Sequence, residues 1–370
     1  MEKSRPLIYA RFEKMETAVT WYRLEVPITG VCGLGLFDAF VEGTGQLGEA
    51  RSGNSLFDAD IIWTHYTQGI DLVELQKVLG RRRRSGAGVE SQKPLILYDV
   101  DDDLFDLLSP SHPGIPPIFS GPYGRRFSES QVERFVRLHF GNIAAADLIV
   151  CSTEWIQSRV LEMVPNAKTH VFLNLVPAFG EELVAHPASS QCRILWQGGA
   201  NHAGALVEVV PILERIHQRE RNVEIVLWGD PGEANPLPNT WTLLEPVPFR
   251  HFFPTLNRMG HDIALAPLGT DGLSAGRSAN KFFESAFCWK PAACVASRRG
   301  IFEKEIRHGD TGMLFRNPEE LDSILTRLIR DPGLRQQIAA KGRRACLSRL
   351  DVGREIGLLA ERILRLVREN

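Results

Sequence analysis

Three residues at helical spacing, Ser278, Lys281 and Glu284, have side chains that could bind a phosphate and a sugar diol. They follow an apolar run and a polar, Gly-rich stretch at 269–278. A helix beginning near Ser278 or Ala279, with Ser278 as N-cap, would direct backbone N–H groups at an anion. The helix dipole disfavours Lys281 in the first turn unless an anion is bound there. Glu284, one turn later, could accept both hydroxyls of a ribose. The pattern fits a nucleotide-diphosphate site and a surface Lys–Glu pair about equally well.

A second group of residues suited to chemistry is the acidic run "YDVDDDLF" at 98–105. Asp99 and Asp101 form an Asp-x-Asp pair, which is typical of metal sites and of phosphatase nucleophiles. Phosphatases of that kind carry Thr or Val two positions after the second Asp, where this chain has Asp103. Four crowded carboxylates repel one another unless backbone N–H groups or cations bind some of them.

The elements that position these residues are short apolar runs alternating with amphipathic stretches, which predicts parallel sheets covered by helices. Strands are expected at 6–12, 59–66, 94–100, 147–152, 169–176, 192–199, 223–230, 240–247, 262–268, 292–297 and 311–315. Helices are expected at 129–146, 152–164, 204–220, 250–259 and 279–289, with several more after 318.

The two series of strands predict two tandem, doubly wound α/β domains whose carboxyl edges face a cleft. We assign the first domain to 1–180, a linker to 181–191, the second domain to 192–350, and an amphipathic helix to 351–370. The pattern does not indicate which domain this last helix packs against.

Composition excludes several classes of function. The 370 residues carry a formal net charge of -2, so no overall positive field recruits nucleic acid. No Cys-x-x-Cys or His-x-x-x-His spacing indicates a metal site. The chain has no signal-peptide h-region and no apolar run long enough to span a membrane, so we expect a cytoplasmic protein. The basic run Arg81–Arg84 leaves a peripheral membrane contact open.

In the second half, Ser-x-x-Lys-x-x-Glu is followed in order by "KPAACVAS", "EIRHGDTGMLF" and "NPEELDSILTRLIRDPGLRQQIAAKGR". This series resembles nucleotide-sugar glycosyltransferases of the GT-B fold. It is most similar to the retaining group that includes bacterial surface-polysaccharide and lipopolysaccharide enzymes. The resemblance covers about 150–350 well and the N-terminal half weakly, and it implies two Rossmann-like domains.

The resemblance also implies roles for individual residues. Glu284 matches the Glu that holds the donor ribose, and Lys281 matches a Lys that faces the diphosphate. His65 is the best N-terminal candidate, so the catalytic assignment is Lys281, Glu284 and His65. Donor binding is assigned to Gly198, Gly199, Asn201, His202, Pro246, Val247, Arg277, Ser278, Ala279 and Asn280. The acceptor side is assigned to Tyr22, Arg23, Asp99 and Asp101, the two aspartates either supporting their loop or contacting acceptor hydroxyls.

The sequence departs from the family pattern at one position and in one loop. Arg277 stands where the family often has a second Glu. The family's usual Arg and Lys, which hold the diphosphate from the first loops of the C-terminal domain, are not evident here, and "GGANHAG" supplies His202 instead. Arg277 and Lys281 are expected to compensate.

The resemblance implies transfer of a sugar from a nucleotide-diphosphate sugar to an acceptor hydroxyl, with retention and without metal or cofactor. The acceptor would be a glycan, a lipid-linked molecule or a protein, in surface glycan or glycoconjugate synthesis. Two alternatives stay open: a catalytically impaired GT-B-fold binding protein, and an Asp-x-Asp phosphotransferase.

Overall fold

The structure is a computed structural model. It describes residues 5–11, 17–42, 56, 59–68, 70–84, 93–105, 128–176, 191–199, 202–232, 237–270 and 272–370. The chain forms two compact units. Unit 1 comprises the described residues of Met1–Pro113, Ser128–Leu175 and Asp351–Asn370, and unit 2 those of Val176–Leu350. Residues 181–190 of the predicted linker lie outside the described residues.

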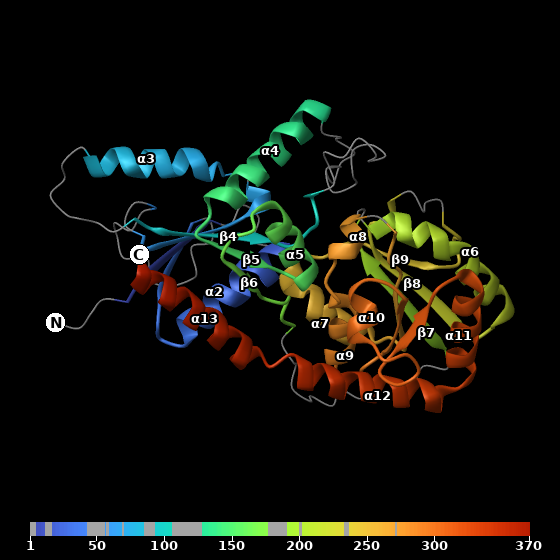
Figure 1. Cartoon of the computed structure of the whole chain (residues 1–370). Coiled ribbons are helices and arrows are strands. Elements are labelled where there is room, and N and C mark those ends of the chain that lie inside the picture. Colours follow the sequence, from blue (N-terminus) through green and yellow to red (C-terminus); the bar gives the residue numbers. More distant parts are fainter. Residues whose placement is uncertain are drawn as a thin grey trace. The chain divides into compact units, whose positions relative to one another are not determined.

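Unit 1 is built on a six-stranded parallel sheet in the order β2-β1-β3-β4-β5-β6. Figure 1 labels β4, β5 and β6 of this sheet. The strands are β1 Leu7–Arg11, β2 Asp38–Glu42, β3 Ile61–His65, β4 Leu95–Val100, β5 Leu148–Cys151 and β6 Thr169–Val171. The helices are α1 Ala18–Thr20, the π-helix η1 Trp21–Glu25, α2 Val26–Gly33, the 3-10 turn η3 Tyr66–Gln68, α3 Leu72–Arg84, α4 Glu129–Ala145, α5 Glu154–Met163 and α13 Val352–Glu369. The side chains of Arg81–Arg84 lie outside the described part of the chain.

Unit 2 repeats the architecture with a parallel sheet in the order β12-β11-β10-β7-β8-β9. The strands are β7 Cys192–Gly198, β8 Val223–Gly229, β9 Thr242–Leu244, β10 Ile263–Ala266, β11 Ala293–Ser297 and β12 Met313–Phe315. The helices are α6 Ala203–Arg219, α7 Phe249–Met259, α8 Gly272–Gly276, α9 Asn280–Phe287, α10 Ile301–Glu305, α11 Pro318–Arg330 and α12 Pro332–Arg349. The predicted doubly wound α/β fold is confirmed.

The core of unit 2 follows from the alternation of side chains along buried strands. In β7, Ile194 and Trp196 join one apolar cluster with residues of α6 and α11. Leu195, between them, joins a second cluster with Trp228 and with Leu256 of α7. Both faces of the sheet are therefore covered, which explains the apolar runs in its central strands.

The strand order locates the sheet edges at which ligands bind. In unit 2, β8 and β9 extend the sheet on one side of β7, and the chain then crosses to add β10, β11 and β12 on the other side. The topological switch point therefore lies between β7 and β10. In unit 1 the equivalent point lies between β1 and β3. Ligands of open α/β sheets bind outside the carboxyl ends of strands at such points.

Helix starts are set by local capping in several places. Thr153 accepts a hydrogen bond from the Ile156 N–H at 3.2 Å and caps α5. Ser128 and Gln131 form a reciprocal capping box at the start of α4. Among the described residues, no helix is both long enough and apolar enough to cross a membrane.

Candidate functional site

The start of helix α9 differs from the sequence prediction. The first helical residue is Asn280 and the N-cap is Ala279, which makes no side-chain capping bond. Ser278 is therefore not the N-cap, because it lies one position too early. The preceding stretch, expected to be a loop, contains the short helix α8. Lys281 still lies in the first turn of α9, and Glu284 one turn later.

Three basic side chains from two segments meet beside α9. The His202 ring, directly before α6, has Nε2 3.4 Å from Arg277 Nη1 and Nδ1 3.4 Å from Lys281 Nζ. Burial, followed by the charges of Lys281 and Arg277, holds the pKa of His202 well below its ordinary value. Burial, followed by the charge of Arg277, lowers the pKa of Lys281 to about 8. We call these three residues the basic cluster.

The contacts of His202 explain what the basic cluster can bind. A neutral imidazole has one N–H donor and one acceptor nitrogen. In His202, Nε2 faces the Arg277 guanidinium and Nδ1 faces the Lys281 amine. While Lys281 is protonated, both neighbours are donors, so the ring N–H must face another donor in one of the two contacts. An anion that accepts hydrogen bonds from all three side chains relieves this conflict. The cluster is thus chemically suited to phosphate oxygens.

Glu284 lies at the same edge of unit 2 and is held by a residue that the sequence analysis missed. Its side chain is only 6% exposed, and its Oε2 accepts a hydrogen bond from Gln197 Nε2 at the end of β7. The Glu284 charge opposes the fall in the Lys281 pKa, so the carboxylate and the ammonium interact. The only sequence signal for Gln197 was its position directly before the predicted donor-binding glycines, Gly198 and Gly199.

Glycines at the ends of β7 and β8 allow close approach of the two backbones. Gly229, opposite Gly198 in the sheet register, has φ +119°, and a Cβ on it would lie 2.1 Å from the Gly198 oxygen. That oxygen accepts the Asp230 N–H at 3.0 Å. The Gly199 oxygen accepts the His202 N–H at 2.9 Å and so fixes the start of α6. Asn201 lies outside the described residues.

Pro246 and Val247, which the sequence analysis assigns to donor binding, lie after β9. Val247 is half-buried against the cluster of Trp228, and Pro246 is exposed beside it. The Trp228 indole N–H donates to the Glu245 oxygen at 3.0 Å, which anchors the segment to β8.

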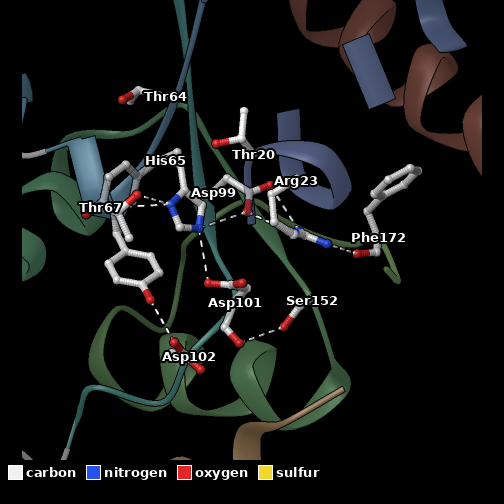
Figure 2. Close-up of polar contacts among 12 residues, drawn as sticks. Thr20, Arg23, Thr64, His65, Thr67, Asp99, Asp101, Asp102, Ser152 and Phe172 are labelled. Carbon is white, nitrogen blue, oxygen red and sulfur yellow. Dashed lines mark hydrogen bonds and ion pairs between the residues drawn. The ribbon is translucent and has the colours of Figure 1, made fainter. Parts of the chain in front are cut away.

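In unit 1, Arg23 is the centre of a buried polar network (Figure 2). Its Nε and Nη2 donate to Asp99 Oδ1 and Oδ2 at 2.7 and 3.0 Å. Its Nη1 donates to the Phe172 oxygen and, at 3.1 Å, to Asn174 Oδ1. Arg23 thereby joins η1, the end of β4 and the segment after β6. A π-helix such as η1 is frequent at functional sites.

These contacts correct three acceptor-side assignments. Asp99 is fully buried and both of its oxygens are bound by Arg23, so Asp99 cannot contact an acceptor hydroxyl. The same burial excludes it as a phosphatase nucleophile. Arg23 and Tyr22 are also buried and cannot contact an acceptor directly. Arg23 instead binds Asp99 and the Phe172 oxygen, and the loop-supporting role of Asp99 stays a prediction.

His65, at the end of β3, is fixed through both ring nitrogens. The Thr67 N–H donates to Nδ1 at 3.3 Å, so the ring proton lies on Nε2, which donates to Asp101 Oδ1 at 3.1 Å. His65 is 1% exposed, and this burial argues against the expected direct catalytic contact. The Asp101 side chain is 12% exposed and is the more exposed member of this pair. Figure 2 shows the contact between His65 and Asp101.

The remaining aspartates of the acidic run have separate partners. Asp102 Oδ2 accepts the Tyr66 hydroxyl at 2.8 Å. Asp103 accepts the Trp155 indole N–H at 2.6 Å and the Phe105 N–H at 3.1 Å. This distribution of donors explains how the run tolerates four carboxylates. In the described ranges, no group of three or more His, Cys, Asp and Glu side chains is arranged to hold a metal ion.

Comparisons with known proteins show which fold this is. No family model matches the sequence, and no curated protein matches it. Among solved structures, HepE from Anabaena in complex with UDP-glucose is 16% identical, with a TM-score of 0.60 over 97% of this chain and 99% of that chain. Sucrose-phosphate synthase from Thermosynechococcus elongatus is 12% identical, with a TM-score of 0.59 over 98% and 100% of the two chains. Trehalose-6-phosphate synthase OtsA is 14% identical, with a TM-score of 0.51 over 83% and 71%. The GT-B fold expected from the resemblance is therefore confirmed.

Proposed function

We propose that this protein is a glycosyltransferase that transfers a hexosyl group from a nucleotide-diphosphate sugar to an acceptor hydroxyl. The observation that carries the proposal is the position of the Gln197–Glu284 pair and the basic cluster at the carboxyl edge of the unit 2 sheet. The Gln197–Glu284 pair is suited to a sugar diol, and the basic cluster is suited to phosphate oxygens. Their combination fits a nucleoside diphosphate better than either ligand alone.

The roles in donor binding follow from the chemistry of each group. Glu284 accepts hydrogen bonds from the ribose hydroxyls, while Lys281, Arg277 and His202 bind the diphosphate. Gly198 and Gly199 let the backbone approach the phosphates. Pro246 and Val247 form the apolar surface for the base. HepE, a structural neighbour, is described in complex with UDP-glucose, which supports a donor of this class.

The reaction then depends on stabilising the diphosphate as it leaves. The bond between the sugar C1 and the phosphate oxygen breaks, and negative charge develops on the diphosphate facing the basic cluster. The acceptor hydroxyl attacks C1 on the face that the nucleotide leaves, and a phosphate oxygen takes its proton. This route gives retention and needs no dedicated protein base. The cations of the cluster supply the charge that a metal ion would otherwise provide.

On the acceptor side, Asp101 is the residue that we assign to a hydroxyl of the acceptor. His65, Arg23 and Asp99 hold it in place through the network of unit 1. The acceptor would be a glycan, a lipid-linked molecule or a protein in surface glycan or glycoconjugate synthesis. A cytoplasmic location, with any membrane contact peripheral, agrees with a nucleotide-sugar donor.

The test is nucleoside-diphosphate release from UDP-, GDP- and ADP-linked sugars, with water or sugar acceptors. We expect release with at least one donor, at least 100-fold less with Glu284→Ala, and no loss in EDTA. The anomeric configuration of the product, read by NMR, tests retention. Binding of a donor without any release would favour the second candidate, a GT-B-fold binding protein, which the Arg277 substitution motivates. Folded protein that neither binds nor cleaves any donor would contradict both.

A further inference from the structure

We propose that Gln197 is a positioning residue of this site, which orients Glu284 and completes a recognition pair for the vicinal diol of a ribose. The inference rests on the proposed function and deepens it. It concerns a residue to which neither the family resemblance nor the spacing of motifs assigns a role. Its basis is the geometry at the end of β7.

Gln197 is placed rigidly. It lies in β7, the strand at the switch point of the sheet, and pairs in register with Trp228 of β8. Its neighbours Trp196 and Gly198 are fixed by the core and by the close approach of Gly229. A side chain anchored on a central strand has little freedom to follow a moving partner. It can therefore impose one orientation on the carboxylate that it contacts.

The hydrogen bond to Glu284 sets the orientation of the Gln197 amide. Nε2 faces the carboxylate, because the reverse orientation would bring two acceptor oxygens together. The Gln197 amide is a neutral N–H donor, so it binds the Glu284 carboxylate without neutralising its charge. Glu284 therefore stays an acceptor, as a hydroxyl-bearing ligand requires.

The other end of the amide identifies the ligand chemistry. Gln197 Oε1 is buried and, within the described part of the chain, has no hydrogen-bond partner. A buried acceptor without a donor is costly, so a ligand that supplies one is favoured there. The pair thus offers the Glu284 carboxylate and the Gln197 carbonyl as two acceptors joined by one hydrogen bond. Two adjacent hydroxyls match this arrangement, whereas the 2′,3′-dideoxy form of the same nucleotide does not.

The test compares two variants of Gln197 in calorimetric titrations of UDP, GDP and ADP and of their 2′,3′-dideoxy counterparts. Gln197→Met keeps the size of the side chain and removes the amide. We expect it to weaken binding of the ribonucleotide roughly 10- to 100-fold and the dideoxy form much less, so that discrimination between the two collapses. An unchanged ratio of the two affinities, in a variant with wild-type thermal stability, would overturn the inference.

Gln197→Glu provides a readout that a merely structural role would not give. It places a second carboxylate against Glu284, so one of the two acids takes up a proton as the pH falls. We expect Gln197→Glu to bind ribonucleotides more weakly than wild type at pH 7. At pH 5.5 a proton shared by the two acids replaces the amide N–H, and the affinity relative to wild type should rise at least 5-fold. Equal impairment at both pH values would contradict the inference. If wild-type protein binds none of the nucleotides, the proposed function itself fails; if it binds them with unchanged discrimination in Gln197→Met, only this inference fails.

Discussion

The environment of a charged side chain, more than its type, decides its role in this protein. Arg23 and Asp99 are both fully buried and satisfy each other through two hydrogen bonds. Arg5 and Asp38, by contrast, approach only to 3.8 Å and are about half exposed. Removing one partner of a buried pair leaves an uncompensated charge, whereas water solvates an exposed one.

Asp99→Asn should therefore destabilise the protein by about 3–5 kcal/mol, because it leaves the Arg23 guanidinium buried beside a neutral amide. The matched control, Asp38→Asn, should change the free energy of unfolding by less than about 1 kcal/mol. Urea unfolding followed by circular dichroism measures both. Equal effects of the two substitutions would mean that Arg23 and Asp99 do not form the buried pair described here.

The basic cluster predicts a pH dependence of nucleotide binding. Lys281 has a pKa of about 8, so it is protonated at neutral pH and loses its charge as the pH rises through that value. The protonated form attracts the diphosphate, so the affinity for the nucleotide should fall measurably, by up to about 10-fold, between pH 7 and pH 9.5. Lys281→Arg, which stays charged in this range, should give a flat profile. A wild-type profile that is flat from pH 7 to 9.5 would rule out Lys281 as a phosphate ligand.

Residues of the site differ in how far sequence could predict them. Lys281, Glu284, Arg277 and His202 carry motif or spacing signals, and the structure brings them to one edge. Gln197 carries no spacing signal, because a single Gln after a strand is common. The sequence analysis missed that Arg23 joins three segments of unit 1. Its partner Phe172 is 149 residues away along the chain, and no local pattern encodes such a contact.

At the level of elements, hydrophobic periodicity predicted most strands and helices to within a few residues. It missed β2, a short edge strand that ends in Glu42, and α2, which buries Pro27, Ile28 and Val31. Such a helix, apolar around its circumference, has no amphipathic period to detect. In unit 1, α13 packs against α2.

The contact between α2 and α13 gives a prediction with an internal control. A Cβ on Gly30 would lie 2.3 Å from Ile356 Cδ1, whereas one on Gly33 of the same helix would meet nothing within 4 Å. Gly30→Ala should destabilise unit 1 by about 1–3 kcal/mol, and Gly33→Ala should be neutral or slightly stabilising. Thermal unfolding measures both. Combining Gly30→Ala with Ile356→Val should recover part of the loss; no recovery would contradict the packing described for α13.

At the scale of the whole molecule, the two ends of the chain build the same unit. Lys168 Nζ lies 3.4 Å from Glu369 Oε2, and Asn370 Nδ2 donates to the Lys93 oxygen at 2.6 Å. The sequence predicted a C-terminal amphipathic helix without indicating its partner, because an apolar stripe shows that a face is buried but not what covers it. The residues that we assign to the donor lie in unit 2, on a sheet with a single switch point.

That assignment is tested most directly by calorimetric titration of the full chain with UDP-, GDP- and ADP-linked sugars. Glu284→Ala removes the proposed ribose ligand, and Glu303→Ala, an exposed residue of α10, is the control. The account predicts that at least one donor binds, that Glu284→Ala weakens it at least about 10-fold, and that Glu303→Ala leaves it unchanged. Folded wild-type protein that binds none of the donors, or a Glu284→Ala variant that binds as tightly as wild type, would contradict it.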